Sequence, residues 1–123
     1  MADLRRQRGT QSEQLAADYL KTRGLLVLAR NLRCRAGELD LVCLDQEVLA
    51  VIEVRQRCGQ QFGGALQSVS WRKQRKIIRA TRFFLLRQAD WHGRAVRFDV
   101  IAVEGPPDGV HRLVWVKDAF RAT

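Results

Sequence analysis

Charged side chains interrupt two stretches of sequence that are otherwise apolar enough to form buried β-strands. Glu38 and Asp40 fall in the first stretch, and Glu53 and Arg55 fall in the second. Charges inside buried strands are costly unless they are paired or bind a metal ion. Two explanations stay open: a network of structural ion pairs, with Glu38 facing Arg55 and Asp40 facing a nearby Arg, or a metal site built from the acids.

The spacing of the two stretches favours a β-hairpin, because only Asp45 and the dipeptide Gln46–Glu47 separate residues 38–44 from residues 48–55. A turn at Gln46–Glu47 places Asp40 opposite Glu53, and opposed residues have Cβ atoms about 5 Å apart. Two carboxylates that close favour a cation between them, and Mg²⁺ held by two carboxylates and several waters suits the pair. Such an ion polarises a phosphodiester and activates a water. The register is critical, since a slip by one residue puts the two acids on opposite faces.

Hydrophobic periodicity predicts the elements that must position these acids, in the order helix–strand–strand–strand–helix–strand–strand. Several strands are apolar on both faces, which indicates a sheet covered on both sides. We therefore expect one α/β domain over residues 1–123, with a mixed sheet flanked by helices, a core at about 10–104 and a terminal extension at 105–123. The expected helices cover residues 11–23 and 71–88, and the expected strands cover residues 25–33, 38–44, 48–55, 95–104 and 112–117.

The two expected helices carry different side chains. In the first, Thr10 is the expected N-cap and Glu13 stands at capping-box spacing, so capping is one role for this Glu. The second, for which Ser70 is the expected N-cap, has an apolar side for the core and a basic stripe along it. The expected core residues are Trp71, Ile77, Ile78, Phe84 and Leu85, and the stripe residues are Arg72, Arg75, Lys76, Arg79 and Arg82.

The composition bounds the class of protein. The chain carries 22 Lys and Arg against 13 Asp and Glu, a formal charge of +9, which favours a polyanionic partner. A well-solvated surface in an Arg-rich genome is the alternative. No apolar run approaches a membrane span, and the basic start lacks the apolar stretch of a secretory signal, so we expect a soluble, cytoplasmic protein. The three cysteines lack metal-site spacing and are expected to be reduced.

Asp40 followed by Glu53-Val54-Arg55 resembles the signature of PD-(D/E)XK nucleases, in which one strand carries an acid and the next carries acid-x-Lys. A wider ordered pattern resembles the YraN-type family (UPF0102), small bacterial proteins considered similar to archaeal Holliday-junction resolvases. The pattern covers roughly residues 11–103, and the resemblance implies a restriction-endonuclease-like fold. The residues that carry it are Glu13, Arg30-Asn31, residues 37–42 and 52–57, Phe62-Gly63, Lys73 and residues 97–100.

The resemblance also implies roles for single residues. Asp40 and Glu53 match metal-binding acids, Glu13 matches a helix glutamate that aids them, and Asp99 is expected to be structural. Arg55 stands where the pattern has Lys. Arginine keeps its proton and so cannot act as a base, but it can hold the scissile phosphate.

The implied function is a Mg²⁺- or Mn²⁺-dependent endonuclease that cuts branched DNA or DNA with single-stranded parts. The resolvase likeness implies a homodimer, because two active sites are needed to cut a junction symmetrically. Lys73 has two readings, a phosphate contact or a displaced lysine that reaches the acids. The expected catalytic residues are Glu13, Asp40, Glu53 and Arg55, and the expected nucleic-acid contacts are Arg57, Arg72, Lys73, Lys76 and Arg79.

Two other functions stay open at this point. A nuclease-fold module that binds nucleic acid without cutting it would keep the basic surface but lose the chemistry at Arg55. A protein–protein adaptor would owe its charge to genome composition alone.

Overall fold

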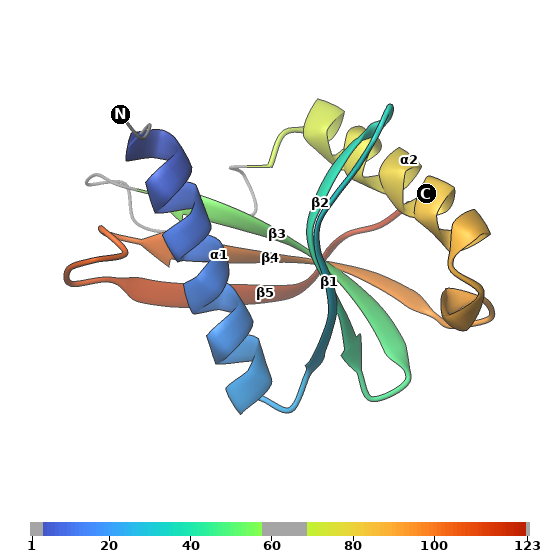
Figure 1. Cartoon of the computed structure of the whole chain (residues 1–123), viewed down its shortest axis with the longest axis horizontal. Helices are drawn as coiled ribbons and strands as arrows, with labels where there is room; N and C mark the ends of the chain where they lie inside the picture. The colour runs from blue at the N-terminus through green and yellow to red at the C-terminus, as the bar shows by residue number, and fades with distance from the viewer. Residues whose placement is uncertain (1–3, 58–68, 123) are drawn as a thin grey trace.

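A computed structural model describes residues 4–57 and 69–122 of the chain. The elements follow the predicted order, and the α/β class with a mixed sheet flanked by helices is confirmed (Figure 1). Cys58 and the Phe62-Gly63 pair, like most of the loop before the second helix, lie outside the described residues. The elements are α1 (Leu4–Thr22), β1 (Leu26–Cys34), β2 (Gly37–Asp45), β3 (Val48–Arg57), α2 (Trp71–Arg87), a 3₁₀ turn (Ala89–Trp91), β4 (Val96–Glu104) and β5 (Arg112–Phe120).

The sheet has the strand order β1-β2-β3-β4-β5. Of the five strands in the described residues, only β3 and β4 pair in parallel, because α2 carries the chain across the sheet between them. The other neighbours are antiparallel. The last strand, β5, pairs with β4 from Arg112 to Phe120 and so belongs to the same sheet. No helix in the described ranges is long and apolar enough to cross a membrane.

Each helix buries an apolar side against its own face of the sheet. Ala16 and Leu20 of α1 pack with Leu41 of β2 and Ile52 of β3 in one cluster. A second cluster, on the other face, joins the buried side of α2 to residues of β2, β3 and β4, with Val51 among them. The strands are apolar on both faces because each face is covered, as the sequence predicts.

The predicted register of the β2–β3 hairpin is confirmed. The ladder runs from Asp45–Val48 at the turn to Leu41–Ile52, so the turn falls at Gln46–Glu47. Gln46 takes a left-handed conformation there, with φ of +56°. Asp40 and Glu53 come directly after the last pair of this ladder, Leu41–Ile52, so both lie at the same end of it.

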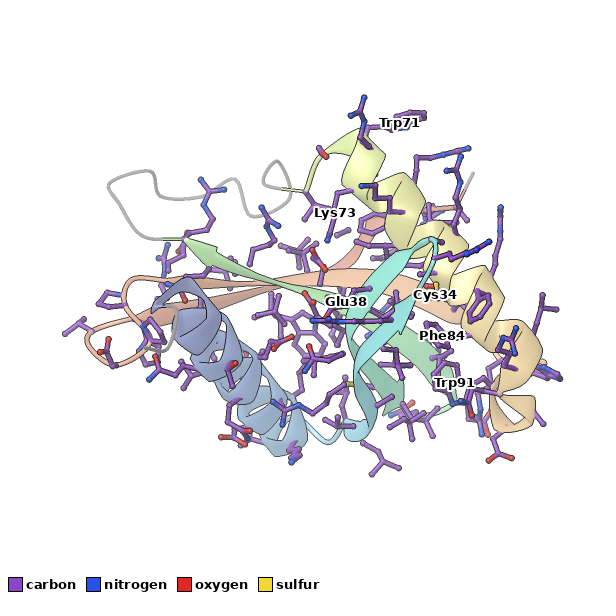
Figure 2. All side chains as sticks on the ribbon, turned by 45° about the horizontal axis from the view of Figure 1, so that its top comes forward. Cys34, Glu38, Trp71, Lys73, Phe84 and Trp91 are labelled. Carbon is purple, nitrogen blue, oxygen red and sulfur yellow. The ribbon has the colours of Figure 1, made fainter. Side chains whose placement is uncertain are left out.

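Two expectations about the helices are wrong. Helix α1 begins at Leu4 rather than Gln11, so Thr10 lies inside it and Glu13 does not close a capping box. The residues before Gly9 are mostly good helix formers, and one Gly costs a helix only about 1 kcal/mol. In α2, Trp71 is 72% exposed, whereas Ile77, Ile78 and Phe84 are buried as expected. Trp71 is the first residue of α2 and lies beyond the part of the helix that packs on the sheet (Figure 2).

Candidate metal and nucleic-acid site

The hairpin of β1 and β2 bends sharply at Asn31 and Asp40. Asn31 is left-handed, with φ of +54°, and the paired residues skip from Arg30–Leu41 to Leu32–Leu39. On either side of this break, side chains that simple alternation would send to opposite faces lie in the same apolar cluster, as Leu39 and Val42 do. Beyond the bend the hairpin leaves β3 and lies against α2 (Figure 1).

The bend opens a gap beside β3 that the side chain of Asp40 fills. The ladder between β2 and β3 ends at Leu41–Ile52, so the β3 residues that follow are not paired with the backbone of β2. The Val54 N–H donates instead to Asp40 Oδ2 at 2.9 Å. The Val54 N–H therefore holds Asp40 where the ladder between β2 and β3 ends.

Glu53 is buried beside Asp40. Its side chain is 4% exposed, and its carboxyl group shares a hydrogen bond with that of Asp40. Burial, followed by the charge of Asp40 and that hydrogen bond, raises the pKa of Glu53 to about 8, against the opposing effect of Lys73 and Arg55. Asp40 and Glu53, which the sequence predicts to face each other, are thus in contact.

The cations beside this pair differ from the expected ion-pair network. Arg55 Nη1 lies 3.8 Å from Glu53 Oε2, rather than facing Glu38. Glu38 pairs with Arg33, its neighbour across β1 and β2, at 3.5 Å. The explanation of these charges as Glu38–Arg55 pairing is wrong, because the hairpin bends before the ladder reaches that pair.

Lys73 reaches the acids from a different element. Its Nζ lies 3.6 Å from Glu53 Oε2. The Ser70 hydroxyl caps α2 and accepts the Lys73 N–H at 3.1 Å, which confirms the predicted N-cap and holds the first turn. Figure 2 shows Lys73 lying on the side of α2 toward the sheet, whereas Trp71 points away from it. Of the two readings of Lys73, the geometry favours the one in which it reaches the acids.

Glu13 approaches Asp40 from α1. A hydrogen bond between the hydroxyl of Ser12 and Gln56 ties this turn of α1 to β3. Burial, followed by the charges of Asp40 and Glu38, raises the pKa of Glu13, whereas Arg30 and Asn31 lower it. Glu13, Glu38 and Asp40 line a hollow of about 590 Å³. Its other lining residues are Gly9, Thr10, Ser12, Asn31, Arg33, Val54 and Gln56.

Asn31 belongs to the pattern that carries the family resemblance, but no role was predicted for it. With its amide nitrogen turned toward the acids, it donates to Glu13 Oε1 at 2.6 Å and to Glu38 Oε1 at 3.2 Å. An Asn within an apolar strand is the signal that could have revealed it, because Asn is depleted in strands and tolerates left-handed backbone.

Two of the acids, rather than three, are placed where they could bind one hard cation such as Mg²⁺. Within residues 4–57 and 69–122, no group of three His, Cys, Asp or Glu side chains is arranged to hold a metal ion. Asp40 is the acid that both Glu13 and Glu53 approach. Mg²⁺ is commonly held by one or two carboxylates, with waters and substrate phosphates completing its shell, so Asp40 and Glu53 suit it.

The comparisons with known proteins agree on one family. The profile of the uncharacterised protein family UPF0102 matches residues 12–103. The chain belongs to this family. It is 45% identical over 112 residues to a UPF0102 protein of Pseudomonas putida strain F1, covering 91% of each chain. It is 42% identical over 122 residues to one of Pseudomonas aeruginosa strain LESB58, covering 95% of this chain and 94% of the other.

In this UPF0102 chain, the other predicted nucleic-acid contacts lie on α2 and at the end of β3. Arg72, Lys76 and Arg79 are exposed on α2, and Arg57 lies at the end of β3, in register with Glu104. The α2 surface also presents Trp71, with the Arg75 guanidinium 5.1 Å from its ring centre.

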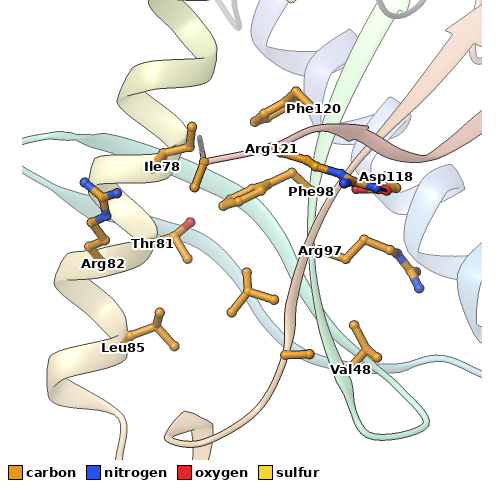
Figure 3. A pocket seen from close by; sticks show the side chains of 13 residues that line it. Val48, Ile78, Thr81, Arg82, Leu85, Arg97, Phe98, Asp118, Phe120 and Arg121 are labelled. Atoms are coloured by element: carbon orange, nitrogen blue, oxygen red, sulfur yellow. Dashed lines mark hydrogen bonds and ion pairs between the residues drawn. The ribbon is translucent and has the colours of Figure 1, made fainter.

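Asp99 has the structural role that was expected. It is fully buried and accepts hydrogen bonds from Arg97, Trp115 and the backbone N–H of Asp118. A second hollow, of about 610 Å³, lies nearby between α2 and the ends of β4 and β5 (Figure 3). Its lining is largely apolar, and the one acid among its lining residues, Asp118, pairs with Arg121 at 2.8 Å. It therefore offers no acid pair for a metal.

Proposed function

We propose that this protein is a metal-dependent endonuclease that hydrolyses phosphodiesters in branched or partly single-stranded DNA. The observation that carries the proposal is the contact between Asp40 and the buried Glu53 at a gap in the sheet, with Arg55 and Lys73 beside Glu53. A structural pair of acids would be neutralised by donors at hydrogen-bond distance. Here each cation stands at ion-pair distance from Glu53 and the second acid raises the pKa of that residue.

Asp40 and Glu53 would hold a Mg²⁺ or Mn²⁺ ion, with Glu13 aiding through Asp40. When bound, the ion supplies charge that polarises the phosphodiester and activates a water. Glu53 would then be ionised, since a cation favours the charged form of a carboxyl group. The backbone of Val54 keeps Asp40 oriented through its hydrogen bond.

Arg55 would contact the scissile phosphate. Its side chain is 38% exposed while its guanidinium lies beside Glu53, so it can reach a ligand without leaving the acids. A guanidinium donates two parallel hydrogen bonds to phosphate oxygens and stabilises charge that develops on them. This role needs no loss of a proton from arginine.

The surface of α2 supports the choice of DNA. Its exposed Arg72, Lys76 and Arg79 would bind flanking phosphates, and their charge agrees with the net charge of +9. The exposed ring of Trp71 offers a face on which a base can stack. Stacking requires an unpaired base, which favours DNA with branches or single-stranded segments over continuous duplex.

The test is cleavage of a labelled four-way junction, the matching duplex and a single strand, with Mg²⁺, Mn²⁺ or a chelator. We expect the wild type to cut the junction or the single strand with either metal, and Glu53→Ala to be slower by about a hundredfold or more. Glu47→Ala, which removes an exposed acid at the hairpin turn, is the matched control and should cut normally.

The alternatives give different results in the same assay. DNA that is bound but left intact under every metal condition would establish the binding module. Phosphate contacts predict that the logarithm of affinity falls with the logarithm of salt concentration, by about 0.9 per contact. Weak binding that salt does not change would favour the adaptor and would contradict both nucleic-acid functions.

A further inference from the structure

We infer that Lys73 is a catalytic residue: its ammonium, carried on α2, orients the attacking water and contacts the scissile phosphate beside Glu53. This inference rests on the proposed nuclease function. It assigns to Lys73 a place at the reacting atoms, rather than among the lysines and arginines that hold the DNA backbone.

The first observation is convergence on one oxygen. Lys73 Nζ and Arg55 Nη1 lie 3.6 Å and 3.8 Å from the same atom, Glu53 Oε2, although one side chain comes from α2 and the other from β3. Both cations are 38% exposed. They therefore flank the buried acid from two elements, and both are exposed enough to contact a ligand.

The second observation is the way in which α2 holds Lys73. The Ser70 cap fixes the backbone N–H of Lys73, and Ile77, one turn later, is buried against the sheet. Residues four apart lie on the same face of a helix, so the packing of Ile77 directs Lys73 toward the sheet. Lys76, by contrast, is exposed and lies beside Gly37 at the tip of the β1–β2 hairpin.

The two cations can do different work because their groups differ in shape. The planar guanidinium of Arg55 matches two oxygens of one phosphate. The ammonium of Lys73 is compact and has three donors, so it can contact Glu53, a water and a phosphate oxygen together. Arg55 would then hold the phosphate by hydrogen bonds, while Lys73 orients the water toward the phosphorus atom.

The hydrolysis that this arrangement serves is balanced without any further reactant. The oxygen of the water forms a bond to phosphorus, and the bond from phosphorus to one sugar oxygen breaks. The proton lost by the water is matched by the one that the leaving sugar oxygen gains, so the products are a phosphomonoester and a hydroxyl. Lys73 remains protonated throughout and only donates hydrogen bonds.

The experiment measures single-turnover cleavage at saturating DNA with Mg²⁺, together with the affinity for DNA. For Lys73→Ala we expect the rate to fall about a hundredfold, a loss typical of a donor to the reacting atoms. Affinity should change less than about threefold, because the flanking phosphates would still be held by the other basic side chains. Lys21→Ala removes an exposed lysine at the end of α1 and should leave both quantities unchanged.

A second variant asks whether a lysine at position 55 can do the same work. We expect Arg55→Lys combined with Lys73→Ala to recover at least about tenfold of the lost rate, because its ammonium would stand beside the same oxygen of Glu53. Thermal melting of each variant, and the milder Lys73→Gln, separate loss of the ammonium from loss of the fold.

Two results would overturn the inference. These are a Lys73→Ala rate at saturating DNA within about threefold of wild type, whatever happens to affinity, and a loss of rate that Arg55→Lys does not relieve. A wild type that cuts no DNA with either metal would instead contradict the proposed function itself.

Discussion

Asp99 and Glu53 are both buried acids on neighbouring parallel strands, yet their surroundings differ. Asp99, on β4, is fully buried and receives hydrogen bonds of 2.8 to 3.1 Å from Arg97, Trp115 and the backbone of Asp118. Glu53, on β3, has two cations no closer than 3.6 Å and a second acid in contact. Among the described residues, Asp99 thus has donors at hydrogen-bond distance, whereas Glu53 has cations at ion-pair distance and a second acid beside it.

Both acids lie where the sheet is irregular, but the two irregularities have opposite consequences. At Asp99, the register of β4 and β5 shifts, and the left-handed Asp118 turns its N–H onto the acid. At Asp40, the left-handed Asn31 bends the hairpin away from β3 and opens a gap. One distortion turns a backbone donor onto an acid, and the other leaves a gap in the sheet beside a pair of acids.

The largest effect expected from this contrast is on stability. Asp99→Asn should lower the free energy of unfolding by about 3–5 kcal/mol, because Arg97, whose side chain is only 19% exposed, loses a buried partner. Glu53→Gln should cost no stability at pH 7, because burial already disfavours the ionised form of the acid that it removes. Urea unfolding measures both, with the exposed Asp108→Asn as control. Equal losses for the two variants would break the contrast.

The next effect is the pH dependence of stability in metal-free buffer. The pKa of Glu53 is about 8 in the folded chain against an ordinary value of 4.5, so its contribution is complete below about pH 4.5 and lost as pH rises through 8. The free energy of unfolding should fall by a few kcal/mol over this range relative to Glu53→Gln, since one pKa unit corresponds to about 1.4 kcal/mol.

The control for this pH effect is Glu47→Gln, an exposed acid that should follow the wild type. Mg²⁺ should restore stability at the alkaline end if Glu53 binds it. Parallel pH curves for the wild type and Glu53→Gln would mean that Glu53 ionises normally in the folded chain.

A smaller effect tests how completely Asp99 is neutralised. Trp115→Phe removes the donor that lies 3.1 Å from Asp99 Oδ2 while keeping an aromatic ring against Tyr19. We expect a loss of about 1.5 kcal/mol, the lower end for a hydrogen bond to a charged group. Trp71→Phe, at an exposed tryptophan, should have no effect in the same urea titration. No loss with Trp115→Phe would show that Arg97 and Asp118 suffice.

Much of the fold could be predicted because its signals are local. The apolar runs fix the strands, and the short connection at Gln46–Glu47 fixes the register that brings Asp40 toward Glu53. The start of α1 could not be placed, because a polar stretch with one Gly is compatible with either helix or coil. Helical spacing aligns Trp71 with Ile78, but spacing does not reveal where the sheet beneath a helix ends.

The site was less predictable than the fold because its geometry depends on contacts between distant segments. The acids were evident as charges in apolar strands. The bend at Asn31 depends on how the hairpin packs against α2, and the approach of Lys73 to Glu53 depends on the docking of that helix. Alternation within a strand predicts neither.

The most direct test of the account is a calorimetric titration of Mg²⁺ and Mn²⁺ into the wild type, Asp40→Asn and Asp18→Asn. Asp18 is an exposed acid on α1 and serves as the matched control. We predict binding to the wild type and to Asp18→Asn, with affinity at least about tenfold weaker in Asp40→Asn because one of two carboxylate ligands is lost. Binding that persists unchanged in Asp40→Asn would remove Asp40 from the site and contradict the account.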